Sequence, residues 1–338
     1  MSNPRTLSRE KPHPHRDIVV IGASMGGVDA LKRLVLELPG DLPATIFVVQ
    51  HMGLGAPGVL AEILSRGAMR ATYAIHNEKF HPGRIYLAPG DNHLMIRLGY
   101  MHVARGPREN GHRPSVDALF RSASRIYGPR VIAVVLTGLL DCGTAGAISV
   151  KARGGLVIAQ DPKDAEFPDM PSSVIQHAGV DHVVSLKGLG PLLNQLVREP
   201  PNPQPNELPD ELAEFEGDEI GISSEIVCPL CQGKLTEAQV GGFRTFRCHV
   251  GHAFSEESLV AEQADEVERA LWAAIRALEE GAMLSARVAR QHHTRDIGQR
   301  FQEKEDIQYQ QAQLLRRMVM GSGMLSREDA TEAEQKSE

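Results

Sequence analysis

Residues 22–27, Gly-Ala-Ser-Met-Gly-Gly, form a glycine-rich turn between a strand-like run and a helical pattern. Such a turn can cradle a phosphate at the helix N-terminus, or it can hold a nucleophilic serine in a sharp bend. The G-x-S-x-G spacing around Ser24 favours the nucleophile. A dinucleotide site would need a glycine in place of Ser24 and an acidic residue after the second strand, which instead ends in Gln50 and His51. The turn by itself leaves both uses open.

His51 directly follows the second strand-like run, residues 45–49. Functional groups of doubly wound sheets gather at the carboxyl ends of the strands, so Ser24 and His51 are expected on one rim. There the imidazole would act as the base that takes the serine proton. The chain contains 14 histidines, so the alternative is that His51 is merely a polar residue at a strand end.

A third strand-like run, residues 131–136, leads into the turn Thr-Gly-Leu-Leu-Asp-Cys-Gly at residues 137–143. The carboxylate in this turn, Asp141, could orient the imidazole and stabilise its charged form, as the acid of a Ser-His-Asp triad does. The alternative is that Asp141 caps the helix that is predicted to begin near residue 143.

Three of the four cysteines cluster late in the sequence. Cys228 and Cys231 form a C-x₂-C turn, and 16 residues separate Cys231 from Cys248, which His249 and His252 follow. Two such pairs supply the four ligands that tetrahedral Zn²⁺ needs. We therefore predict a zinc ribbon with the ligands Cys228, Cys231, Cys248 and His252, and with His249 as the alternative fourth ligand. Free cysteines in a small reduced module are the competing possibility, although so short a module has little apolar core of its own.

The elements that must position these groups alternate along residues 17–197. Short β-branched runs alternate with helical patterns, which is typical of a parallel sheet covered by helices on both faces. Residues 84–105 hold three strand-like pieces without a helix between them, which predicts an antiparallel hairpin at one edge of the sheet. The expected fold class is α/β, a doubly wound and mainly parallel sheet, with a separate small zinc-ribbon-like module and an α-helical hairpin.

The composition changes after residue 197. Residues 198–219 contain five prolines and eight acidic residues, which predicts an extended linker. Ser255 can cap a helix, and an apolar stripe with steps of three and four follows it. A second helix is expected from about Thr294 to Met320. The predicted organisation is a disordered N-terminus at 1–16, a catalytic domain at 17–197, a linker at 198–224, the zinc module at 225–254, a helical hairpin at 255–320 and a disordered tail at 321–338.

Composition excludes several classes of function. The 338 residues carry 36 Lys and Arg against 43 Asp and Glu, a formal charge of −7, which disfavours nucleic-acid binding through a general positive field. No apolar run is long enough to span a bilayer, and residues 1–16 lack the apolar stretch of a signal peptide. Four cysteines are too few for a disulfide scaffold. We expect a cytoplasmic protein with no nucleic-acid partner and no direct membrane insertion, whose C-terminal helices are the candidate surface for self-association.

Residues 17–197 resemble the catalytic domain of the CheB-type protein-glutamate methylesterases of bacterial chemotaxis. The resemblance is specific because several motifs occur in the family's order. They are I-G-A-S-x-G-G at 21–27, Q-H-M at 50–52, Y-x-A-P-G-D-x-H at 86–93, H-R-P-S-V-D at 112–117, L-T-G at 136–138, G-x-A-G at 143–146 and M-P at 170–171.

The resemblance implies that Ser24 is the nucleophile and His51 the base, with no catalytic cofactor. The implied reaction hydrolyses γ-glutamyl methyl esters on chemoreceptor helices to glutamate and methanol, and the same enzymes can deamidate certain receptor glutamines. In the family's spacing, however, the triad aspartate falls on Cys142, and Asp141 stands one residue too early. Losing this acid costs serine proteases on the order of 10⁴ in turnover, so we expect weakened or rerouted activity.

The resemblance also indicates a substrate region beside the triad. Backbone N–H groups near Met25 and in the 138–140 turn are the expected oxyanion donors. His112 and Arg113 could line a cleft that accepts a Glu/Gln-rich helix, or Arg113 and Asp117 could instead hold their loop together. The predicted substrate and oxyanion region comprises Met25, Gly26, Gly138, Cys142, His112 and Met170.

Two features depart from the chemotaxis enzymes. Those enzymes carry an N-terminal receiver domain, whereas about sixteen residues precede the first strand here, so control is expected from elsewhere or is absent. Tails with the F-R-C-H-x-G-H pattern occur on receiver-less relatives.

The leading function is a serine esterase acting on chemoreceptor-type proteins, and the main alternative is a catalytically impaired binding or scaffold protein of a chemosensory system. A nucleotide-binding α/β protein is disfavoured by Ser24 and His51.

Overall fold

The computed structural model describes residues 15–52, 58–201, 203, 205, 207–209, 212–216, 221–240, 242–291 and 295–321. The chain divides into two compact units, Met1–Ser258 and Leu259–Glu338. The predicted disordered ends, 1–16 and 321–338, lie outside the described residues apart from residues 15, 16 and 321.

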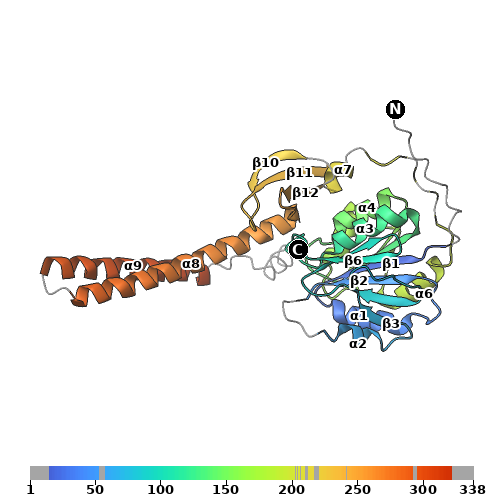
Figure 1. Cartoon of the computed structure of the whole chain (residues 1–338), viewed down its shortest axis with the longest axis horizontal. Helices are drawn as coiled ribbons and strands as arrows, with labels where there is room; N and C mark the ends of the chain where they lie inside the picture. Colours follow the sequence, from blue (N-terminus) through green and yellow to red (C-terminus); the bar gives the residue numbers. More distant parts are fainter. Residues whose placement is uncertain are drawn as a thin grey trace. The chain divides into compact units, whose positions relative to one another are not determined.

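A seven-stranded sheet forms the centre of the first unit (Figure 1), with the strand order β3-β4-β2-β1-β7-β8-β9. Every neighbouring pair is parallel, as continuous apolar strands predict. Because β1 lies between β2 and β7, the carboxyl ends of these three strands meet at one rim. The strand β3 is not among the strands predicted from the sequence. The strands are β1 Ile18–Ala23, β2 Thr45–Gln50, β3 Arg70–Tyr73, β4 Arg84–Leu87, β7 Val131–Val135, β8 Leu156–Gln160 and β9 His182–Val184.

Helices cover both faces of this sheet (Figure 1). Successive residues of β1 point to opposite faces, so Val20 joins one apolar core and Val19 joins the other. The core around Val20 is covered by α3 Val116–Tyr127, α4 Thr144–Ala152 and α5 Asp169–His177. The core around Val19 is covered by α1 Gly27–Glu37, α2 Leu60–Leu64 and α6 Leu186–Leu196. The predicted doubly wound α/β architecture is confirmed.

The predicted hairpin is present as β5 His93–Arg97 and β6 Tyr100–Ala104. These strands form a separate two-stranded antiparallel sheet, whereas β4, the first strand-like piece of the same stretch, joins the parallel sheet. Leu94, Ile96 and Met101 are buried in the core that α3 covers. The hairpin therefore adds to that face of the sheet.

The segment predicted as an extended linker contains a short helix, α7 Leu212–Glu216. Leu212 and Phe215 are buried in the core that α3 and α4 cover. The Glu216 carboxylate forms ion pairs with Arg125 at 2.7 Å and with Arg153 at 2.6 Å. Two apolar side chains three residues apart and a buried ion-pair cluster thus fix this part of the acidic segment against the first unit.

An antiparallel four-stranded sheet follows, in the order β10-β11-β12-β13. Phe243 of this sheet is buried in the same core as Phe215. The first unit therefore includes the predicted zinc module as well as the parallel sheet. The strands are β10 Ile222–Val227, β11 Lys234–Val240, β12 Phe243–Cys248 and β13 Ala253–Ser255.

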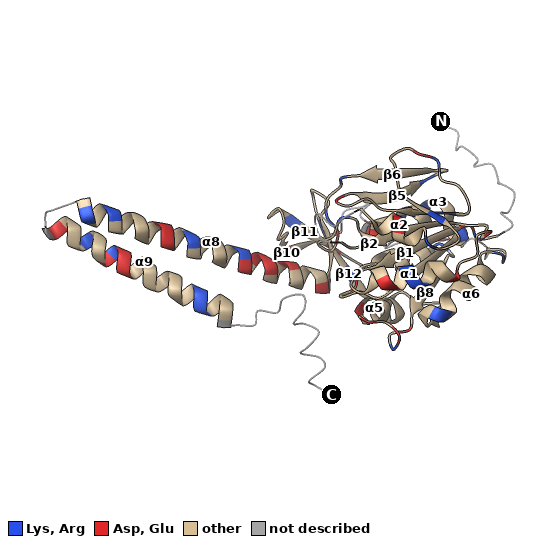
Figure 2. Ribbon diagram, turned by 90° about the horizontal axis from the view of Figure 1, so that it is seen from below, with Lys and Arg blue, Asp and Glu red and all other residues tan. Residues whose placement is uncertain are grey.

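Two long helices, α8 Glu256–Gln291 and α9 Arg295–Gly321, account for the predicted helical hairpin. Arg316 donates to Glu279 Oε1 at 2.6 Å, and Ser285 donates to Gln308 Oε1 at 3.1 Å, so the two helices pair along their length. Figure 2 shows acidic and basic residues interspersed along both helices. No helix among the described residues is both long enough and apolar enough to cross a membrane.

Candidate active site

Ser24 lies in the short turn between β1 and α1. Its N–H donates to Thr137 O at 3.0 Å, and its carbonyl accepts from Gly27 N at 2.9 Å and from Gln50 Nε2 at 2.7 Å. Gly26 has a φ of 72°, a left-handed conformation that glycine adopts without strain. The turn is therefore held from β2 and from the end of β7, and it leaves Ser24 at the N-terminus of α1.

His51 follows β2, and its N–H donates to Ala23 O at 3.0 Å, which continues the β1–β2 pairing by one residue. The Nδ1 atom of His51 lies 3.3 Å from Ser24 Oγ. The His112 ring stacks on the His51 ring with the centroids 3.8 Å apart and the planes at 19°. The structure thus brings together the predicted nucleophile and base, and it places His112 against the base.

The other ring nitrogen of His51 does not meet Asp141. Cys142 Sγ lies 3.6 Å from His51 Nε2, whereas Asp141 Oδ1 accepts a hydrogen bond from Ser255 Oγ at 2.6 Å. The described structure therefore gives no hydrogen bond between Asp141 and His51 that would support Asp141 as the third member of a triad. Asp141 and Cys142 are consecutive residues, and their side chains meet different partners. Burial, reinforced by the nearby carboxylate of Glu257, raises the pKa of Asp141 to about 7.

Asp141 also does not cap α4. That helix has Gly143 at its N-cap without a side-chain hydrogen bond. Ser255 itself takes the predicted capping role at α8, because Ser258 N donates to Ser255 Oγ at 3.1 Å. Asp141 is thus tied to the first turn of a helix more than a hundred residues away in the sequence.

Asp117, at the start of α3, is a buried carboxylate that holds the turn carrying Cys142. It accepts from Gly146 N at 2.7 Å and from Gly143 N at 3.0 Å, and Cys142 Sγ lies 3.5 Å from its Oδ2 atom. Burial raises the pKa of Asp117, and the two amide hydrogen bonds oppose that effect. From the sequence, Asp117 was considered only as a residue that holds its own loop together. Its place in the H-R-P-S-V-D motif was the signal that could have identified it.

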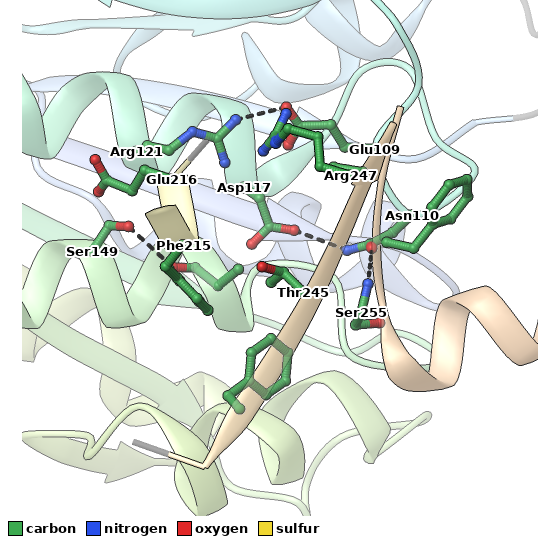
Figure 3. Close-up of a pocket in the computed structure, with 14 residues that line it drawn as sticks. Glu109, Asn110, Asp117, Arg121, Ser149, Phe215, Glu216, Thr245, Arg247 and Ser255 are labelled. Atoms are coloured by element: carbon green, nitrogen blue, oxygen red, sulfur yellow. Dashed lines mark hydrogen bonds and ion pairs between the residues drawn. The ribbon is translucent and has the colours of Figure 1, made fainter. Parts of the chain in front are cut away.

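Asn110 connects this carboxylate to the C-terminal module (Figure 3). Its Nδ2 atom donates to Asp117 Oδ2 at 3.0 Å, while its Oδ1 atom accepts from Ser255 N and from Ser258 Oγ, both at 2.8 Å. Its backbone N–H also donates to Ala253 O at 2.7 Å. No sequence pattern pointed to Asn110.

A small polar pocket beside Asn110 lies between α3, α4 and the module (Figure 3). Arg121 donates to Glu109 Oε1 at 2.6 Å within it. Burial alone would raise the pKa of Glu109, but the positive charges of Arg121 and Arg247 outweigh it and lower the pKa to about 2. The interface between module and sheet is therefore charged as well as apolar.

Two backbone N–H groups of the predicted oxyanion region already donate to acceptors within the protein. Gly138 N donates to Phe167 O at 3.0 Å, and Leu140 N lies 3.4 Å from Asp169 Oδ2. The Met25 amide follows Ser24 directly and precedes the first turn of α1, so Met25 keeps its place as a predicted oxyanion donor. Gly138 has a packing role instead, as described next.

Gly138 lies against Ser24. A β-carbon at this position would be 2.7 Å from Ser24 Cβ and would overlap Met170 Sδ. Met170 is fully buried, so its side chain has no room to retreat. Gly138 and Met170 thus shape the wall beside Ser24.

Arg113, the second cleft candidate, holds its loop. Its Nη2 atom pairs with Asp91 Oδ1 at 2.6 Å, and its Nη1 atom donates to Gly106 O at 2.7 Å. Arg113 is therefore engaged on the protein itself, whereas His112 beside it reaches the His51 ring.

The four predicted metal ligands converge. One ligand atom from each of Cys228, Cys231, Cys248 and His252 lies within 4.8 Å of the others. His252 Nδ1 is 3.7 Å from Cys228 Sγ and 3.6 Å from Cys248 Sγ, and the Cys231 and Cys248 sulfurs are 3.6 Å apart. Tetrahedral Zn²⁺, with bonds of about 2.3 Å to sulfur and about 2.0–2.1 Å to nitrogen, needs ligand atoms about 3.6–3.8 Å apart. The cluster fits a metal ion of that kind, with His252 and not His249 as the fourth member.

Comparison with known proteins agrees with this geometry. The family model for the CheB methylesterase matches residues 19–193, which is more than half of the chain. The chain belongs to the CheB methylesterase family. A solved structure of the CheB methylesterase catalytic domain of Thermotoga maritima matches this CheB-family chain at 38% sequence identity and a TM-score of 0.52, covering 54% of the chain and 98% of that structure.

Curated relatives extend the same family assignment. The protein-glutamate methylesterase/protein-glutamine glutaminase 2 of Methanosarcina mazei is 38% identical over 54% of this CheB-family chain and 52% of its own length. A putative protein-glutamate methylesterase/protein-glutamine glutaminase of Leptospira interrogans is 36% identical over 53% of the chain and 94% of its own length. The chain spans about half the length of the M. mazei relative and of several others like it.

Proposed function

We propose that this protein is a serine hydrolase that cleaves glutamate γ-methyl esters on chemoreceptor-type proteins. The observation that carries the proposal is the 3.3 Å approach of His51 Nδ1 to Ser24 Oγ at the N-terminus of α1. The relatives named protein-glutamate methylesterase/protein-glutamine glutaminase support the substrate class and a second, deamidating reaction.

The proposed reaction uses the two side chains in sequence. Ser24 Oγ attacks the ester carbonyl carbon while its proton passes to His51 Nδ1. The Met25 amide and the positive end of the α1 dipole stabilise the oxyanion. Methanol leaves with the proton from His51, and a water molecule activated by the same nitrogen then hydrolyses the acyl-serine to release glutamate. A glutamine side chain would follow the same path with ammonia as the leaving group.

With Cys142 beside His51, we expect the site to catalyse the reaction more slowly than a site with a carboxylate at the same position. A neutral thiol 3.6 Å from His51 Nε2 accepts a hydrogen bond but does not neutralise the imidazolium that forms during attack. Burial raises the pKa of the Cys142 thiol well above its usual range, which keeps it uncharged. We therefore expect slower turnover than in a Cys142→Asp variant.

Labelling with a fluorophosphonate tests the proposal directly. The parent protein should become phosphonylated at Ser24, and the Ser24→Ala variant should not. A helical peptide containing one γ-methyl glutamate should release methanol with the parent and not with that variant. If the parent labels as fast as Cys142→Asp, the penalty assigned to the thiol is wrong.

A second candidate is a binding or scaffold protein of a chemosensory system. The observation that favours it is the missing carboxylate at the imidazole, together with the attachment of Asp141 to Ser255. This candidate predicts no labelling of Ser24 by the fluorophosphonate and retained binding of receptor-type helical peptides. Serine labelling therefore separates the two functions.

The Cys₃His cluster is proposed to hold a structural Zn²⁺, and thiolate ligands suit the reducing cytoplasm that we also propose as its location. Metal analysis of freshly purified protein should find one zinc per chain, and its absence would overturn this assignment. Self-association through α8 and α9 is the remaining proposal, which sedimentation analysis of the full chain would test.

A further inference from the structure

The Cys142 thiol contacts a buried carboxylate as well as the catalytic histidine proposed above. Cys142 Sγ lies 3.6 Å from His51 Nε2 and 3.5 Å from Asp117 Oδ2. We infer that Asp117 is a positioning residue that supplies, through the Cys142 thiol, the carboxylate that the triad position lacks. The inference rests on the proposed function only in assuming that Ser24 and His51 perform the chemistry.

The surroundings of Asp117 fix the direction of the hydrogen bonds. The carboxylate accepts from three N–H donors, on Gly143, Gly146 and Asn110. An acid surrounded by donors is held as an acceptor, so the Cys142 S–H points to Asp117 and leaves the sulfur lone pairs for His51. The imidazole must then carry its proton on Nε2, which frees Nδ1 to accept the serine proton.

Only one proton moves when the serine attacks. It passes from Ser24 Oγ to His51 Nδ1, and the ring becomes positively charged. The Nε2 proton stays on the ring and the thiol proton stays on sulfur. The negative charge of Asp117 stabilises the imidazolium through the Cys142 thiol, which lies 3.5 Å from Asp117 Oδ2 and 3.6 Å from His51 Nε2.

The neighbouring acid, Asp141, is engaged with a different part of the protein. Asp141 Oδ1 is occupied by Ser255 Oγ at 2.6 Å. A further titratable group, His112, stacks on the face of the His51 ring, with the centroids 3.8 Å apart. The Cys142 thiol is thus in contact with both the Nε2 atom of His51 and the carboxylate of Asp117, and we call these two contacts the relay.

The closing experiment measures the pKa of His51 by NMR of histidine-labelled full-length protein, with the resonance assigned through His51→Gln. Asp117→Asn should lower the His51 pKa by about one pH unit, because an anion that favours the imidazolium is removed. Asp181→Asn is the matched control. Asp181 lies at the opposite end of the sheet, where it accepts from Lys151 Nζ and Val157 N, and its variant should leave the His51 pKa unchanged.

Variants at Cys142 test the relay without disturbing the three N–H anchors of Asp117. Cys142→Ser keeps a group that both accepts and donates, so its Ser24 phosphonylation rate should stay within a few-fold of the parent. Cys142→Ala breaks the relay and should lower that rate about tenfold. Combining Asp117→Asn with Cys142→Ala should cost less than the product of the two single effects.

The two readouts separate the inference from the proposed function. An unchanged His51 pKa in Asp117→Asn, or equal rates for Cys142→Ala and Cys142→Ser, would overturn the relay even in an active enzyme. A lowered His51 pKa in a protein whose Ser24 never labels would support the relay and overturn the proposed function. If Asp117→Asn does not fold, the two Cys142 variants still test the relay. Each is then measured both by the His51 pKa and by the rate of Ser24 labelling.

Discussion

Replacing Asp141 by asparagine should stabilise the protein at neutral and alkaline pH. The side chain is 2% exposed and accepts a 2.6 Å hydrogen bond from Ser255 Oγ. Burial raises its pKa from 3.8 to about 7, and the carboxylates of Glu257 and Asp117 add to the effect. An asparagine keeps the acceptor oxygen and removes the buried charge.

The sign and size of this change in stability follow from the linkage between proton binding and folding. The folded protein binds the Asp141 proton more tightly than the unfolded chain, so stability present at low pH is lost as pH rises from about 4 to about 7. Each pH unit in that window corresponds to about 1.4 kcal/mol, which gives a loss of about 4 kcal/mol by pH 8. Asp141→Asn does not titrate, so its advantage over the parent should grow by that amount between pH 4 and pH 8.

Urea unfolding followed by circular dichroism between pH 4 and pH 8.5, at constant salt and zinc, measures the difference between parent and variant. Subtracting the two cancels the other groups that titrate. A difference that stays constant across this range would refute the reasoning, because Asp141 would then ionise as it does in the unfolded chain. A fall of about 10³-fold or more in Ser24 phosphonylation by Asp141→Asn would instead assign it the role of triad acid.

Three further changes have defined outcomes. Gly138→Ala should slow Ser24 phosphonylation about 100-fold, because the new methyl group would press on Ser24 Cβ and on Met170 and displace the nucleophile by about 1 Å; mass spectrometry of the labelled protein measures this, and a rate near the parent's would contradict it. Glu109→Gln should destabilise the protein by about 3 kcal/mol at pH 7, because the Glu109 carboxylate, with a pKa of about 2 beside Arg121, contributes stability above pH 4.5 that is lost as the pH falls towards 2. Urea unfolding at pH 3 and pH 7 should show the smaller loss at pH 3. Treatment with a chelator, which would remove the proposed Zn²⁺, should raise hydrogen exchange in β11 and β12 while the parallel sheet stays protected. Unchanged exchange in those strands would argue against a structural metal.

The parallel sheet and the Ser24–His51 pair were accessible from sequence because each depends on local pattern. Alternating strands and helices specify the sheet, and residues just after neighbouring parallel strands must share a rim. Ser255 as a helix cap was equally accessible, since capping depends on a few adjacent residues. These predictions needed no knowledge of which distant segments meet.

The partners of Asp117 and Asp141 were not accessible in that way. Asp117 meets the turn at Gly143 and Gly146 because α3 and α4 pack together, and Asp141 meets Ser255 because the C-terminal module packs on the same face. Spacing along the chain carries no signal for either contact. The helix α7 was not predicted for a related reason. The segment around it, residues 198–219, is acidic and proline-rich like an unstructured linker, and the sequence does not show that Glu216 pairs with two arginines.

The Asn110 side chain binds two different parts of the chain, which limits where the protein can be truncated. One side-chain amide binds the carboxylate under the active-site turn with its nitrogen and the first turn of α8 with its oxygen. A fragment ending at residue 197 would contain the whole parallel sheet, yet it would leave Asn110 Oδ1 and the Asp141 carboxylate without their serine partners. The smallest piece that keeps this region intact runs to Ser258, where the first compact unit ends. A foreign tail grafted after residue 197 would therefore replace the donors that now satisfy Asn110 Oδ1 and Asp141 Oδ1.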